Sequence, residues 1–162
     1  MLVFSPDVSV LLLLPSWTAQ GTMVGIGGLD FGSASPEDRK VFPYLYYSGV
    51  DTSQLAGLLH GQSTDVALND YVRGALFGHE RVLPQLSLAR RPVQEHEIQE
   101  QLRAYDVYVN TFSYSEALKH PFAYVVVNAN SQFDFSRIDR WYEREPAERV
   151  GQFELYRVKP KR

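Results

Sequence analysis

The chain has 162 residues, of which 44% are hydrophobic and 22% are charged, so it is long enough for a buried core and has an ordinary globular composition. Its formal net charge of −3 argues against a nucleic-acid-binding protein, because such proteins usually carry a basic field. Cysteine is absent, so an extracytoplasmic location is allowed without being required. The most apolar run, VSVLLLLP at residues 8–15, is much shorter than the about 20 residues that a spanning helix needs. These properties predict a single soluble domain over residues 1–162.

The N-terminal part predicts a strand-helix-strand unit. Leu2–Ser5 has the pattern of a buried strand, and Val8 to about Ala19 has that of a buried helix with Asp7 or Ser9 as its N-cap. Thr22–Ile26 predicts a second strand. Because the chain opens directly on a strand, we expect it to be part of a longer protein.

Helix signals dominate the middle of the chain. Ser35-Pro36-Glu37-Asp38 combines an N-cap, a proline at the first helical position and acids in the first turn, so a helix should follow it. Gln54–Leu59 predicts a short helix, and Ser63-Thr64-Asp65 opens another that ends at Gly78. Leu83–Pro92 is expected to be a loop. Glu95 to about Phe112 is the clearest helix, since it carries apolar side chains at helical spacing, namely Ile98, Leu102 and Tyr105.

The last third predicts most of the remaining sheet. A short helix is expected at Ser115–His120, and FAYVVVNA at Phe122–Ala129 is the best strand in the chain, apolar on both faces as in the middle of a parallel sheet. Ser136–Glu143 predicts a helix. Two strand-like segments around Gly151-Gln152 predict a closing antiparallel hairpin, Arg149–Val150 and Phe153–Val158.

Together these elements predict an α/β fold, with a mostly parallel sheet, helices on its faces and a C-terminal antiparallel hairpin. This would be a layered αβα, Rossmann-like arrangement. Right-handed crossovers would then align the carboxyl ends of the first three strands.

The first candidate site is the glycine-rich loop of residues 25–32, because glycines after a strand allow backbone amides to approach a phosphate. Gly25, Gly27 and Gly28 match neither the dinucleotide fingerprint nor a P-loop, and a tight turn is the competing explanation. The second candidate is the crevice at the carboxyl ends of the strands, where ligands bind in open α/β sheets. Asp7, Asp30, Asn128 and Asn130 could lie there and hold a metal or a sugar hydroxyl; alternatively, Asp7 caps a helix and Asn128 closes a turn.

Other side chains give weaker signals. The four histidines are far apart in the sequence and lack the spacing of a zinc site, so no metal or other cofactor is expected. There is no Gly-x-Ser-x-Gly elbow, and the serines have the positions of N-caps. Asp134 and Asp139 could be imagined as a general acid and base, but a charged helix face explains them better. The basic tail, Arg157–Arg162, could contact anionic lipid, or it could be a solvated terminus.

The two ends of the chain carry a resemblance. Three parts of the chain look like the segment that follows the last membrane spans in polytopic bacterial proteins of the GT-C glycosyltransferase-like class. They are the opening Leu2–Gly28, with a strand, SPD, LLLLPSWTAQG and TMVGIGG, the central SASPEDRKVFPYLYYSGV, and the closing HPFAYVVVNANSQF and RWYEREPAERVGQFELYRVKP. The resemblance covers about half of the chain, and its motifs are structural. It implies a soluble C-terminal domain on the extracytoplasmic face. No position matches the loop that holds the catalytic acids of that class, so no catalytic residue is carried over.

Three functions follow as hypotheses. The chain could be a noncatalytic accessory domain of such a membrane glycosyltransferase, with the membrane-embedded part of the parent chain and a glycan or lipid-linked sugar as partners. It could instead be a small-molecule-, nucleotide- or sugar-binding α/β domain or enzyme that uses the loop after the second strand. It could also be a protein-interaction module with exposed Tyr and Trp anchors. No nucleic-acid partner is expected.

Overall fold

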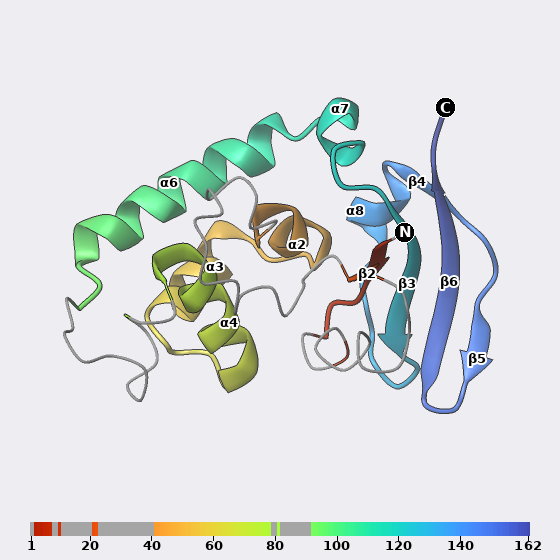
Figure 1. The fold of residues 1–162 in the computed structure, drawn as a ribbon, viewed down its shortest axis with the longest axis horizontal. Coiled ribbons are helices and arrows are strands. Elements are labelled where there is room, and N and C mark those ends of the chain that lie inside the picture. Colours follow the sequence, from red (N-terminus) through yellow and green to blue (C-terminus); the bar gives the residue numbers. More distant parts are fainter. Residues whose placement is uncertain (1, 8–9, 11–20, 23–40, 79–80, 82–91) are drawn as a thin grey trace.

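The computed structural model describes residues 2–7, 10, 21–22, 41–78, 81 and 92–162 of the chain (Figure 1). Helices and strands occur together in a mixed α/β arrangement, which confirms the expected fold class at that level. The described helices are α2 (Val41–Tyr47), α3 (Thr52–Leu59), α4 (Val66–Phe77), α6 (Glu95–Thr111), α7 (Tyr114–Ala117) and α8 (Ser136–Asp139). The described strands are β1 (Leu2–Phe4), β2 (Gly21–Thr22), β3 (Phe122–Asn128), β4 (Tyr142–Arg144), β5 (Glu148–Val150) and β6 (Phe153–Pro160).

The sheet is mixed, and the prediction of a mostly parallel sheet is wrong for the described strands. Its order is β2-β1-β3-β6-β4, with β5 also paired to β6. β1 is parallel to both β2 and β3, whereas β6 is antiparallel to β3, β4 and β5. The two-residue connection at 151–152 imposes the antiparallel pairing of β5 with β6, because parallel neighbours need a crossover of a dozen residues or more.

The closing hairpin is confirmed. Val150 of β5 pairs with Phe153 of β6, and Gly151 takes up a positive φ of 60° in the turn between them. A two-residue turn with a residue in the left-handed region matches the right-handed twist of the flanking strands. β6 continues beyond the expected Val158 to Pro160 because it also pairs with β4.

The helix expected at Ser136–Glu143 is correct only in its first half. α8 ends at Asp139, and Tyr142–Arg144 forms strand β4 instead, with Tyr142 opposite Pro160 and Glu143 opposite Lys159. The local sequence suits a helix, but the free edge of β6 offers backbone hydrogen bonds to an extended chain. A distant pairing partner thus overrides local propensity.

The central helices follow their sequence signals closely. Asp51 caps α3 in a capping box with Gln54, and Asp65 caps α4 by accepting a 2.9 Å hydrogen bond from the backbone N–H of Leu68. Gly78 ends α4 with a φ of 92°, which favours glycine. α6 buries the expected apolar side, Ile98, Leu102 and Tyr105. α7 is shorter than predicted and ends at Ala117.

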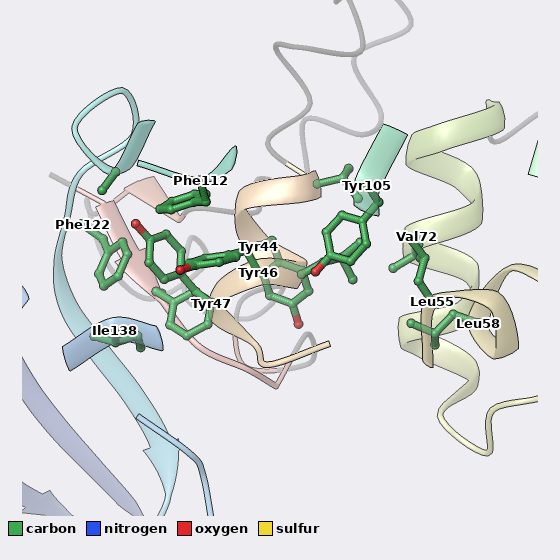
Figure 2. Close-up of a cluster of buried hydrophobic side chains, with 14 of the residues drawn as sticks. Tyr44, Tyr46, Tyr47, Leu55, Leu58, Val72, Tyr105, Phe112, Phe122 and Ile138 are labelled. Atoms are coloured by element: carbon green, nitrogen blue, oxygen red, sulfur yellow. The ribbon is translucent and has the colours of Figure 1, made fainter. Parts of the chain in front are cut away.

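The core has an aromatic cluster around α2 and an aliphatic cluster between α3 and α4, as Figure 2 shows. Phe122 of β3 stacks on Tyr142 with ring centroids 4.4 Å apart, and Tyr46 of α2 stacks on Phe112 at 3.8 Å. Leu55, Leu58 and Val72 lie between α3 and α4. Most aromatic side chains of the described part are buried or pack against the core, and burial of one such side chain stabilises the fold by about 1.5–3 kcal/mol.

In Figure 1, helices α2, α3, α4 and α6 lie to the left of the sheet, and the β5–β6 hairpin lies at the far right. Several predicted segments lie outside the described residues, so their predictions stay open. They are the helix at 8–19, the second strand beyond Thr22, the glycine-rich loop at 25–32, the helix start at 35–38 and nearly all of the loop at 83–92.

Candidate functional site

The sheet places two of the predicted site residues at the same edge. β1 runs parallel to β3, with Phe4 opposite Val125, so the chain leaves both strands in the same direction. Asp7 follows β1 by three residues, and Asn128 is the last residue of β3. The carboxyl ends of adjacent parallel strands are where open α/β sheets bind ligands. The expected alignment of strand carboxyl ends is therefore present at β1 and β3.

The chain after β1 is held in place by packing and hydrogen bonds. Ser5 is fully buried, and its Oγ accepts a 3.2 Å hydrogen bond from the backbone N–H of Asp7. The hydroxyl of Tyr44 on α2 donates to the carbonyl of Pro6 at 2.9 Å. The Asp7 carboxylate is thus presented on an exposed residue at the end of an anchored segment.

Asn128 serves a turn, as the simpler interpretation of the sequence predicted. Its Oδ1 accepts from the backbone N–H of Asn130 at 2.9 Å, and its carbonyl accepts from both the backbone N–H and the hydroxyl of Ser131. This arrangement is a typical Asx turn. One acceptor of Asn128 is therefore already used within the protein, which weakens its candidacy as a ligand-binding group.

The other four proposed binding residues, Gly25, Gly27, Gly28 and Asp30, lie outside the described residues. Whether they meet Asp7 and Asn128 stays a prediction. Of the seven proposed residues, the described structure places Asp7 and Asn128 at the carboxyl ends of β1 and β3, and Asn130 in the turn that follows β3.

The imagined acid–base pair has structural roles. Asp134 accepts hydrogen bonds from the backbone N–H of Ser136 at 2.8 Å and from its hydroxyl at 2.9 Å, and these bonds hold the pKa of Asp134 below its usual range. Asp139 accepts two hydrogen bonds from the guanidinium of Arg144, at 3.0 and 2.9 Å. Each carboxylate is therefore engaged with its own local donor.

A shallow depression of about 580 Å³ surrounds this Arg144–Asp139 pair. The Arg144 guanidinium lies 3.9 Å from the ring centroid of Phe135 and 4.9 Å from that of Tyr156. A ligand would have to displace contacts that the lining already makes with itself. The lining residues are Asp139, Tyr142, Glu143, Arg144, Glu145, Pro146, Tyr156 and Lys161. Sequence reasoning missed this cluster because it expected a helix through residue 143.

The histidines of the described part are separate, and no group of three or more potential metal ligands occurs among those residues. His60 lies at the end of α3, with Nδ1 2.8 Å from the carbonyl of Ala56 and Nε2 3.1 Å from a carboxylate oxygen of Glu95 on α6. The bond to the Ala56 carbonyl, together with Glu95, raises the pKa of His60. Both ring nitrogens face acceptors, so the arrangement favours the imidazolium.

Buried tyrosines are poor candidates for proton transfer. Burial raises the pKa of Tyr44, Tyr71 and Tyr105 far above neutrality, and the Tyr105 hydroxyl donates to the carbonyl of Val50 at 2.8 Å. These hydroxyls stay protonated, and those of Tyr44 and Tyr105 act as structural donors.

The basic tail is hydrogen-bonded to the fold through Lys161, while Arg157, Lys159 and Arg162 are exposed. The backbone N–H of Lys161 donates to the carbonyl of Trp141 at 2.9 Å, and its own carbonyl accepts from the hydroxyl of Tyr114. Its ammonium donates to the carbonyl of Asp139. Lys159 pairs with Glu143 at 2.9 Å. These contacts fix the end of β6 against α7 and α8.

Among the described helices, none is long and apolar enough to cross a membrane. Comparison of the chain with protein-family models, with curated proteins and with solved structures finds no match. Only the residues and their contacts therefore bear on what the chain does.

Proposed function

We propose that the chain is a noncatalytic accessory domain of a GT-C glycosyltransferase-like membrane protein, held on the extracytoplasmic face. Its partners would be the membrane-embedded part of the parent chain and a glycan or lipid-linked sugar. No cofactor or catalytic residue is proposed. The sugar transfer itself would belong to the membrane part.

One observation supports this proposal most. The opening and closing segments that carry the resemblance lie together in the sheet, since β1 from the first segment pairs with β3 from the last, and β3 pairs in turn with β6. Five consecutive pairs join β3 to β6, from Tyr124 opposite Arg157 to Asn128 opposite Phe153. A domain of the proposed kind should hold its opening and closing segments in one folding unit, and here β1 and β3 pair although 117 residues of chain lie between them.

The experiment uses the absence of cysteine from the chain. Val107 on α6 is 61% exposed, so Val107→Cys provides an accessible thiol at little structural cost. The native gene, with a C-terminal tag and this substitution, is expressed in its own host, and intact cells are treated with a membrane-impermeant maleimide. Ile98→Cys, at a buried position of the same helix, serves as the unreactive control.

The proposal expects the tagged protein in the membrane fraction, at a mass well above the 18.5 kDa of this chain, with Val107→Cys labelled in intact cells. A tagged product of that smaller mass in the soluble fraction would contradict it. Labelling only after the cells are lysed would contradict the extracytoplasmic placement alone.

A second candidate is a binding site for a nucleotide, nucleotide-sugar or other small molecule at the carboxyl ends of the strands. The adjacent parallel strands β1 and β3 favour such a binding site. The same proposal includes the glycine-rich loop and a Rossmann-like layering of helices on the sheet. A bound ligand raises the stability of the fold by about 2.7 kcal/mol at a hundredfold excess over its Kd. Thermal unfolding with nucleotides, nucleotide-sugars and divalent cations tests it. A stabilisation that is lost in Asp7→Asn supports the candidate, and no stabilisation by any of them rejects it.

A further inference from the structure

The short helix α7 and the end of β6 form one surface patch, defined here as Tyr114, Leu118, Lys119, Lys161 and Arg162. Tyr114 and Leu118 are 39% and 44% exposed, and they lie one helical turn apart, with the backbone N–H of Leu118 bonded to the carbonyl of Tyr114. The bond from the Tyr114 hydroxyl to the carbonyl of Lys161 joins the helix to the tail. α7 and the C-terminal end of β6 both lie at the top of Figure 1.

The patch differs from the other exposed apolar positions in the described residues. Val66, Val107 and Val150 are also exposed, but each belongs to a different element, and single exposed apolar residues are normal on any surface. In the patch, the Tyr114 hydroxyl bonds the carbonyl of Lys161, the residue before Arg162, and Lys119 follows Leu118 in the chain. The ammonium of Lys161 itself donates to the carbonyl of Asp139. The Lys119 side chain is 63% exposed while it pairs with Glu116, and Arg162 is exposed.

We propose that this patch is a membrane-contact surface that binds the anionic headgroups of a phospholipid bilayer. Tyr and Leu suit the boundary between headgroups and acyl chains, and neighbouring Lys and Arg side chains gain energy from negative lipids. The inference rests on the proposed function, in which the domain stays close to a bilayer.

The register of the sheet supports an orientation in which the patch faces the bilayer. Leu2 pairs with Phe122 at the start of β3, and the last residues of β6 lie beside the same end, since Arg157 pairs with Tyr124. In the proposed function, the membrane-embedded part precedes Leu2 and so joins the domain at the edge that carries the patch. The opposite edge, with Asp7 and Asn128, then faces away from the bilayer.

The test measures cosedimentation of the whole 162-residue chain with vesicles of phosphatidylcholine and phosphatidylglycerol, and with vesicles of phosphatidylcholine alone. The variant Leu118→Ser with Arg162→Gln removes one aliphatic and one basic side chain from the patch. Val107→Ser with Arg103→Gln removes the same kinds of side chain from exposed positions on α6 and is the matched control. Circular dichroism establishes that both variants are folded.

We expect the wild-type chain to bind the anionic vesicles and to lose binding as salt is raised, because salt screens headgroup attraction. The patch variant should lower partitioning more than about fivefold, because loss of Arg162 accounts for about fivefold and loss of Leu118 adds to it. The control variant should bind like the wild type. Absence of binding to anionic vesicles, equal losses in the two variants, or equal binding to neutral vesicles would overturn the inference.

This experiment separates the inference from the function on which it rests. If the chain proves to be part of a larger membrane protein but the 162-residue chain fails to bind vesicles, only the membrane-contact inference is rejected. A chain that binds vesicles through the patch, but is found as a small soluble protein in cells, rejects the accessory-domain proposal alone. Self-association of the wild type that Leu118→Ser abolishes, without vesicle binding, would show that the patch contacts a second copy instead and would also overturn the inference.

Discussion

Arg137 of α8 should be a main link between the C-terminal half of the chain and the helices. One guanidinium nitrogen, Nη1, donates to the carbonyls of Tyr46 and Val50 at 2.9 and 3.0 Å, and the guanidinium lies 5.1 Å from the ring centroid of Tyr46. The side chain is half-buried. Substitution by methionine keeps much of the aliphatic stem but removes every donor.

The expected loss of stability follows from these contacts. A hydrogen bond from a charged donor contributes about 1.5–3 kcal/mol. Half-exposure reduces that value, and the Val50 carbonyl keeps its 2.8 Å bond from the Tyr105 hydroxyl, so we expect Arg137→Met to cost about 2 kcal/mol in total. Arg140→Met is the control on the same segment. Arg140 is exposed and lies 4.7 Å from the ring centroid of Trp141, a contact worth at most about 1 kcal/mol.

Equilibrium unfolding in urea, followed by tryptophan fluorescence, measures both losses, and equal slopes in the two transitions would show that the same two states are compared. Tyr105→Phe, alone and combined with Arg137→Met, completes a double-mutant cycle. Because both donors bond the Val50 carbonyl, the double variant should lose more than the sum of the single losses, by about 0.5 kcal/mol or more. Equal costs for Arg137→Met and Arg140→Met would refute this reasoning.

Three further predictions concern single positions. The pKa of His60 is raised in the folded state, so its stabilising contribution is complete below the pKa of an unfolded histidine and is lost as the pH rises through the folded pKa. The difference in Tm between the wild type and His60→Gln should therefore be seen in mild acid and vanish in alkali. Gly57→Ala in α3 should raise stability by about 0.5–1 kcal/mol, because open space surrounds the new methyl group. Gly151→Ala should lower stability, because φ there is 60°. Changes of the same sign in the urea assay would contradict this prediction. Asp65→Ala should cost about 1 kcal/mol through loss of the α4 cap, while Asp70→Ala within that helix should not, and a smaller loss at Asp65 than at Asp70 would rule out the capping account.

Local signals predicted the middle of the chain well. The N-cap at Asp65 and the stop at Gly78 bound α4, and the apolar side of α6 lies in the core. Caps act through side-chain bonds to backbone groups three residues away, and helical periodicity repeats within a few turns. Such interactions are complete within a segment and do not depend on the rest of the fold.

Predictions that needed a distant partner were less successful. The apolar strand β3 was expected in a parallel setting, but it is parallel to β1 and antiparallel to β6. Its run of valines indicates burial on both faces, and burial is the same whichever way the neighbours run. Likewise, residues 142–144 have no local signal for the edge strand that they form on β6.

In the candidate sites too, local features were predictable from the sequence and contacts with distant residues were not. The sequence placed Asp7 after a strand and Asn128 at the end of one, and a turn role for Asn128 was predictable because asparagine bonds its own backbone two residues on. The pairing of Asp139 with Arg144 required the change from α8 to β4, and the meeting of Tyr114 with Lys161 joins positions 47 residues apart.

The sequence by itself determined the α/β class, the helix ends with capping side chains and the closing hairpin at Gly151, because each depends on short-range geometry and composition. Only the tertiary structure decided the direction of the strands beside β3, the conversion of residues 142–144 to a strand, and the anchoring of the tail. The physical reason is that the pairing of strands and the contacts between distant side chains depend on the free energy of the whole fold compared with that of other arrangements of the chain. No short window of the sequence contains both partners.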